Sequence, residues 1–129
     1  MFVPGFDRQE FSVATTDGHM FRLLEPVTFT RVDGTKILLP AGTESDGASV
    51  PRQLWASLPP FGDHWKSAFL HDAAYRLKTR PVIGSKQECD DLFAESLEAC
   101  KVPDIERHIL YQGVVIFGEP AYLAARMKA

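Results

Sequence analysis

Residues 69–76 read F-L-H-D-A-A-Y-R, which places a histidine beside an aspartate in an otherwise apolar segment. Its neighbours on both sides are also mostly apolar, which predicts a central, largely buried helix over about residues 63–78. An ionisable group is costly to bury unless it is paired, hydrogen-bonded or neutral. His71 and Asp72 therefore each need a partner elsewhere in the protein.

A second helix is predicted over residues 85–100. Ser85 can cap its first turn while Glu88 reaches back to the cap, which is the capping-box pattern. At about 100° per residue, six side chains fall on one stripe, which we expect to be the core face: Cys89, Leu92, Phe93, Ser96, Leu97 and Cys100. The short connection between the two helices favours an antiparallel pair.

The same geometry separates the two adjacent carboxylates of the C-D-D sequence. Asp90 lies on the flank of the core stripe, whereas Asp91 lies on the opposite side of the helix. We expect Asp91 to face solvent together with Glu95 and Glu98. Only Asp90 is predicted to point into the protein.

Helical spacing also predicts which side chains meet. His71 and Tyr75 are four residues apart and share one row, and Asp72 and Arg76 share the neighbouring row. In an antiparallel pair, Asp90 returns close to the row of His71 and Tyr75. The expected arrangement is a histidine oriented by a buried carboxylate and steadied by a tyrosine.

This arrangement suggests a chemistry. A neutral imidazole is a good general base near pH 7, and a carboxylate on its other nitrogen fixes the tautomer, so His71, Asp90 and Tyr75 are the candidate catalytic residues. Without an obvious nucleophilic partner, His71 would activate water. Asp72 could bind a hard cation such as Ca²⁺, the expected cofactor, with carbonyl or carboxylate oxygens from glycine-bearing loops containing Asp46 and Gly62. Asp46 fits an Asx turn equally well.

A non-catalytic interpretation explains the same residues. His71 paired with Asp90, and Asp72 paired with Arg76 or Arg80, would then form a structural network that holds the helices and the loop together. Spacing alone leaves both interpretations open.

The remainder of the chain predicts an α+β fold. The first half has strand and turn patterns that predict two hairpins, the second of them turning at Asp33-Gly34: residues 11–14 with 20–24, and residues 27–31 with 36–39.

A third helix is predicted over residues 104–117, with Gly118 as its C-cap and Pro120 opening a short final helix. Strands followed by helices favour α+β over alternating βαβ units. We therefore expect one domain of small antiparallel hairpins and then a bundle of three to four helices around a central antiparallel pair. Its parts are a β-rich region, a packed loop and a helical region: residues 1–44, 45–62 and 63–129.

Composition narrows the functional classes. The net charge of −3 and the absence of a basic cluster give no reason to expect nucleic acid. The N-terminus does not fit a signal peptide, and the longest apolar run of the C-terminal part is too short for a transmembrane segment. Cys89 and Cys100 would lie about 16 Å apart on one helix at ~1.5 Å per residue, too far for a disulfide. A reducing, cytoplasmic setting is the simpler expectation.

Four ordered motifs resemble a known family. S-D-G-A-S-V-P, P-P-F-G, L-H-D-A-A-Y-R and S-K-Q-E-C-D-D-L-F are similar to domain-of-unknown-function family 1353, which is common in phage and prophage genomes. The resemblance spans roughly residues 20–118. It implies a phage-type protein located in the bacterial cytoplasm or on a virion, with a phage or host protein as a conceivable partner.

A second, local resemblance bears on chemistry. H-D-x-x-Y followed on an antiparallel helix by C-D-x-x-F is similar to the phospholipase A2 pattern. The resemblance implies His71 as general base for water, Asp72 as calcium ligand, Tyr75 as hydrogen-bonding support and Asp90 as the carboxylate behind the histidine. The implied substrate is a lipid or another ester. The alternative is a non-catalytic phage protein, associated with virion or tail or binding a host factor.

Overall fold

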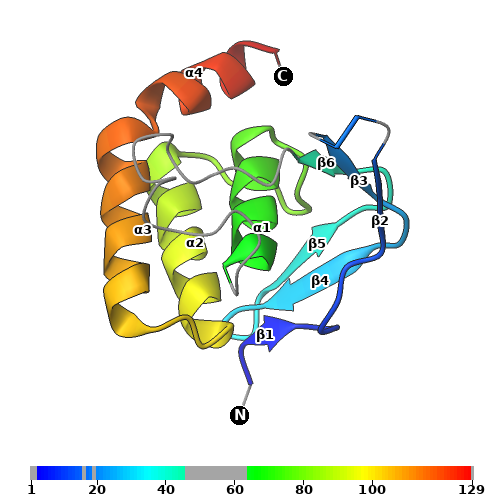
Figure 1. The fold of residues 1–129 in the computed structure, drawn as a ribbon, viewed down its shortest axis with the longest axis horizontal. Coiled ribbons are helices and arrows are strands. Elements are labelled where there is room, and N and C mark those ends of the chain that lie inside the picture. Colours follow the sequence, from blue (N-terminus) through cyan, green and yellow to red (C-terminus); the bar gives the residue numbers. More distant parts are fainter. Residues whose placement is uncertain (1–2, 16, 19, 46–63, 129) are drawn as a thin grey trace.

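The computed structural model describes residues 3–15, 17–18, 20–45 and 64–128, and it has an α+β fold, as predicted. Within these described residues, six short strands precede four helices (Figure 1). The strands are β1 Gly5–Phe6, β2 Val13–Thr15, β3 Phe21–Leu23, β4 Val27–Thr30, β5 Lys36–Leu39 and β6 Glu44–Ser45. The helices are α1 Trp65–Tyr75, α2 Lys86–Ala99, α3 Asp104–Phe117 and α4 Glu119–Lys128.

The strands form two small antiparallel sheets. One has the order β1-β4-β5 and the other β2-β3-β6. Both predicted hairpins are confirmed, since β2 pairs with β3 and β4 pairs with β5. The two-residue strands β1 and β6, which complete the sheets, have no sequence pattern long enough to predict them.

The turn between β4 and β5 differs from the predicted two-residue turn. Thr30 pairs with Lys36, so five residues lie between the strands, and the Arg31 amide donates to the carbonyl of Thr35. Gly34 has a φ of 89°, whereas Asp33 does not have a positive φ. The turn therefore needs one left-handed residue and not two, and glycine supplies it without steric cost.

Helix α1 occupies the centre of the fold. In Figure 1 it lies between α2 and the strands, with α3 on the far side of α2 and α4 crossing one end of the helices. One core cluster joins the strands to α1 and α2, through side chains that include Phe29, Leu39, Phe69 and Leu70. A second cluster fills the space between α1, α2 and α3, with Phe93 prominent in it. Since α1 contributes to both clusters, most of its residues are buried.

The connection between α1 and α2 is anchored to a sheet. Arg80 exchanges two backbone hydrogen bonds with Leu38 of β5, at 2.8 and 2.9 Å. Helix α1 ends earlier than predicted because Leu77 takes a left-handed φ of 59°, and the Lys78 amide returns to the carbonyl of Ala73. This Schellman-type ending turns the chain toward β5.

The predicted packed loop, residues 45–62, lies outside the described residues apart from Ser45. The same holds for Asp46 and Gly62, so their predicted part in a cation site stays a prediction. Within the described ranges, no helix is long and apolar enough to cross a membrane.

Candidate functional site

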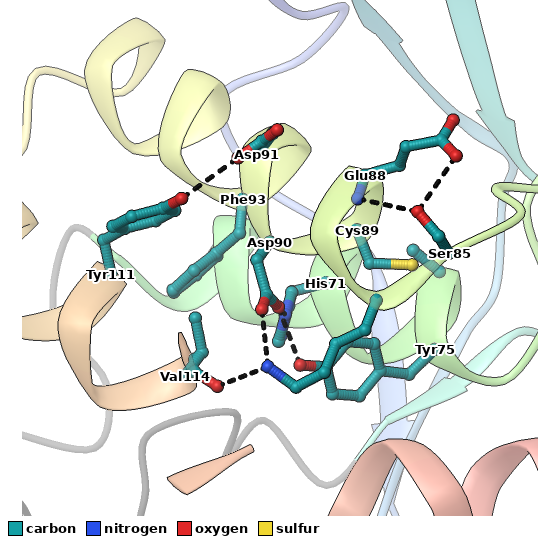
Figure 2. Close-up of polar contacts among 12 residues, drawn as sticks. His71, Tyr75, Ser85, Glu88, Cys89, Asp90, Asp91, Phe93, Tyr111 and Val114 are labelled. Carbon is teal, nitrogen blue, oxygen red and sulfur yellow. Dashed lines mark hydrogen bonds and ion pairs between the residues drawn. The ribbon is translucent and has the colours of Figure 1, made fainter. Parts of the chain in front are cut away.

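The predicted histidine–carboxylate pair is present. His71 Nε2 lies 2.7 Å from Asp90 Oδ1, and the Tyr75 hydroxyl donates to the same oxygen at 2.7 Å. Figure 2 shows the side chains of His71 and Tyr75 on α1 converging on Asp90 of α2. Both members of the pair are buried, with side chains 2% and 3% exposed. The antiparallel packing of α1 against α2 thus brings together the three residues proposed from spacing.

A lysine completes the surroundings of the carboxylate. Lys86 Nζ donates to Asp90 Oδ2 at 2.7 Å and to the carbonyl of Val114 on α3 at 2.8 Å. Both oxygens of Asp90 are therefore bound by donors. Sequence reasoning missed Lys86, although its position four residues before Asp90 on one helix was an available signal.

The protonation states follow from this geometry. Burial lowers the pKa of His71 by more than the nearby Asp90 raises it, and the charge of Lys86 lowers it further. Burial alone would raise the pKa of Asp90, but hydrogen bonds from His71, Lys86 and Tyr75 outweigh it and hold that pKa below its ordinary value. Burial and the adjacent Asp90 raise the pKa of the Tyr75 hydroxyl. At neutral pH the His71 imidazole is therefore neutral, Asp90 is a carboxylate and Tyr75 is a phenol.

The tautomer of His71 follows as well. Because Nε2 faces a carboxylate, it carries the proton, and Nδ1 of the neutral ring carries the lone pair. Nδ1 is buried, and among the described residues no donor hydrogen-bonds to it. The ring is held between Tyr75 and Phe93, with centroids 4.1 and 4.6 Å away. The structure therefore fixes a basic nitrogen in one orientation.

Asp72 has an arginine as a neighbour. Its Oδ1 lies 3.2 Å from Arg76 Nε in an i,i+4 ion pair, which was one of the two pairings predicted. Within the described parts of the chain, no group of three or more His, Cys, Asp or Glu side chains is arranged to hold a metal ion. Asp72, the predicted cation ligand, therefore already faces the guanidinium of Arg76.

The predicted contrast between the adjacent carboxylates is confirmed. Asp91 is exposed and accepts a hydrogen bond from the Tyr111 hydroxyl at 3.1 Å, on the other side of α2 from the histidine (Figure 2). The prediction for Glu95 was wrong. Its carboxylate accepts from Arg31 Nε and from the Val32 amide, both at 2.8 Å, and so fastens the β4–β5 turn to α2. Helical periodicity correctly places Glu95 away from the core between the helices, but the β4–β5 hairpin packs against that side of α2.

The junction of α3 and α4 reaches the site through Gly118. This residue is at the C-cap, as predicted, but its φ of −81° is not left-handed, so the conformation of the cap does not require glycine. A Cβ atom there would overlap the carbonyl oxygen of Val114 and lie 2.9 Å from the Tyr75 hydroxyl. Glycine is needed for close approach to the tyrosine that supports Asp90.

Arg126 fastens α4 to the other end of the site. Its guanidinium donates to the carbonyls of Ala74 and Tyr75 in the last turn of α1 and to those of Ile83 and Gly84 in the connection, at 2.7–3.2 Å. A cation is favourable at the C-terminal end of a helix. The sequence gives no local signal for this contact, which depends on the direction α4 takes.

The two cysteines are free thiols. Cys89 is buried and Cys100 is partly buried. Burial raises the pKa of Cys89 to about 11, so this thiol is protonated at neutral pH. Its position on the core face of α2 agrees with the predicted stripe.

The fold and site define an α+β protein with a buried, oriented histidine between two antiparallel helices. Residues 21–114 match the family described as "Protein of unknown function (DUF1353)". The chain therefore belongs to this family, in agreement with the resemblance noted from its motifs.

A curated relative is similarly uninformative about activity. The "Uncharacterized protein y4jT" of Sinorhizobium fredii is 29% identical over 101 residues, which are 77% of this chain and 29% of the relative. The chain thus spans less than a third of that protein's length. No solved structure gives a significant match.

Proposed function

We propose that the protein is a hydrolase in which His71 acts as general base for a water molecule that attacks an ester, such as that of a lipid. The observation that carries the proposal is the state of the imidazole. Its Nε2–H group is held by Asp90, while Nδ1, the basic nitrogen, has no hydrogen-bond donor among the described residues. The resemblance of the helix pair to phospholipase A2 is consistent with this role.

The proposed reaction needs only a water molecule and side chains of this protein. Water oxygen bonds to the carbonyl carbon as Nδ1 takes a proton, and the imidazolium is stabilised by Asp90 through Nε2–H. Collapse of the tetrahedral intermediate breaks the ester bond, and Nδ1 returns the proton to the departing alkoxide. The products are a carboxylic acid and an alcohol. Because Nδ1 is buried, substrate can reach it only if neighbouring residues of the protein move.

Calcium is a separate part of the proposal. Asp72 is the residue that would contribute to its binding, and the ion would stabilise negative charge developing on the substrate oxygen. The ion pair of Asp72 with Arg76 opposes cation binding, so no step above depends on the metal. A site in the folded state must raise the melting temperature as Ca²⁺ is added, by mass action. An unchanged melting temperature at millimolar Ca²⁺, in wild type and in Arg76→Ala, would exclude the metal.

The alternative is a non-catalytic protein of phage origin, a virion or tail component or a binder of a host factor. The observation that favours it is the connectivity of Asp90. Contacts through His71, Tyr75 and Lys86 tie α1, α2 and α3 together, as a structural network would. A network of that kind needs no access to Nδ1.

Ester hydrolysis by matched variants separates the two proposals. Wild type, His71→Gln and the exposed control His108→Gln would be assayed on aryl esters of increasing chain length and on phospholipid vesicles, with and without Ca²⁺. The hydrolase proposal predicts turnover by wild type and His108→Gln, and its loss in His71→Gln with the circular dichroism spectrum retained. Absence of turnover by wild type on the whole panel, or equal turnover by His71→Gln, would favour the network.

A further inference from the structure

Lys86 has two contacts that together hold its ammonium at a fixed position. Nζ lies 2.7 Å from Asp90 Oδ2 and 2.8 Å from the Val114 carbonyl oxygen, and the side chain is 16% exposed. The Val114 carbonyl also accepts the Gly118 amide at 2.9 Å, in the last turn of α3. The ammonium is therefore tethered between α2 and α3, unlike a surface lysine that samples solvent.

The two oxygens of Asp90 have different partners. Oδ1 accepts from His71 and Tyr75, both on α1, and Oδ2 accepts from Lys86. The carboxylate therefore lies between the imidazole of His71 and the side-chain nitrogen of Lys86. The contact of Oδ2 with Lys86 leaves Oδ1 turned toward the imidazole.

We propose that Lys86 is a positioning residue for His71, because its tethered ammonium holds the Asp90 carboxylate so that Oδ1 faces the imidazole. This deepens the proposed function by adding a residue that orients the general base. The proposal rests on that function only for its biological meaning, since the hydrogen bond between His71 and Asp90 can be measured without any substrate.

Other charged or titratable groups face the same cluster. The Cys89 thiol on α2 and Glu119 at the start of α4 both lie close enough to raise the pKa of the Tyr75 hydroxyl. Tyr111 on α3 is influenced by Asp90 as well as by Asp91. In this set Lys86 is the cation that contacts the Asp90 carboxylate, so its removal leaves Oδ2 without that donor.

The test is the NMR signal of the His71 Nε2–H group, measured in the full chain at pH 7. Lys86→Met removes charge and hydrogen bond, Lys86→Gln removes charge and keeps a donor, and Lys86→Arg keeps the charge. Exposed Lys36→Met, on β5, is the matched control. Without the ammonium, the Asp90 carboxylate can rotate, and its hydrogen bond with Nε2 changes. We expect the Nε2 proton signal to shift in Lys86→Met and Lys86→Gln, and to stay at the wild-type position in Lys86→Arg and Lys36→Met.

The outcomes are distinct. If Lys86→Met and Lys86→Gln lower the melting temperature while the Nε2 proton signal of His71 stays as in wild type, Lys86 is only structural and the proposal is overturned. If Lys86→Met does not fold, Lys86→Gln decides on the same criterion. Failure of wild type to hydrolyse any ester would remove the hydrolase proposal and leave the NMR result on Lys86 standing.

Discussion

Replacing Asp90 by asparagine tests the buried cluster with a nearly isosteric change. The side chain is 3% exposed, and its carboxylate accepts from His71, Tyr75 and Lys86, each at 2.7 Å. If the asparagine oxygen stays toward α1 as an acceptor, its NH₂ group is turned toward the ammonium of Lys86, which loses its partner. Breaking a buried ion pair by removing one partner costs about 3–5 kcal/mol. Because one acceptor remains, we expect a loss of about 3 kcal/mol, which corresponds to a fall of roughly 10–15 °C in Tm.

The neighbouring residue supplies the control. Asp91→Asn removes the same charge one position away, where the carboxylate is exposed and has a single 3.1 Å contact with Tyr111. Urea unfolding followed by circular dichroism would measure both variants at pH 7. We expect Asp91→Asn to stay close to wild type. Equal stabilities for the two variants, or a loss below about 1 kcal/mol for Asp90→Asn, would refute the assignment of Asp90 as the buried partner of His71.

Three further predictions follow from the same contacts. In the folded protein the pKa of His71 is lowered, whereas in the unfolded chain His71 takes up its proton near pH 6.5. The free energy of unfolding should therefore decrease as the pH is lowered below about 6.5, by up to about 1.4 kcal/mol per pH unit. Urea unfolding across pH 5–8 checks this, and an unchanged pH dependence in His71→Gln contradicts it. Gly118→Ala should lower Tm because its methyl group meets Tyr75, an effect of about 1–3 kcal/mol for overpacking; Gly84→Ala, where a methyl makes only ordinary contact, should not. Arg126→Lys should speed amide hydrogen exchange in α4 selectively, because a lysine cannot span several carbonyls, and unchanged α4 exchange would count against this anchor.

Much of the site could be predicted because its geometry is local to one pair of helices. The capping box at Ser85 set the phase of α2, and the phase set which of Asp90 and Asp91 faces the protein. The periods of α1 then placed His71 and Tyr75 on one row. Antiparallel packing of two adjacent helices brought the rows together without further information.

What could not be predicted depends on elements distant in the sequence. Lys86 needed knowledge of where α3 ends, since its second partner is the carbonyl of Val114, 28 residues away. The role of Glu95 needed the position of a hairpin 63 residues away. Gly118 matched a helix-ending pattern, yet the side chain it accommodates belongs to α1. In each case a local rule was satisfied, and tertiary contact supplied the physical reason.

The central claim is that His71 is a neutral, oriented base at neutral pH, and nitrogen NMR tests it most directly. In ¹⁵N-histidine-labelled protein at pH 7, the ring of His71 should show a protonated Nε2 in a strong hydrogen bond to Asp90 and an unprotonated Nδ1. In Asp90→Asn that Nε2 proton signal should move, whereas in Asp91→Asn it should not. An imidazolium at pH 7, or a ring protonated on Nδ1, would contradict the claim.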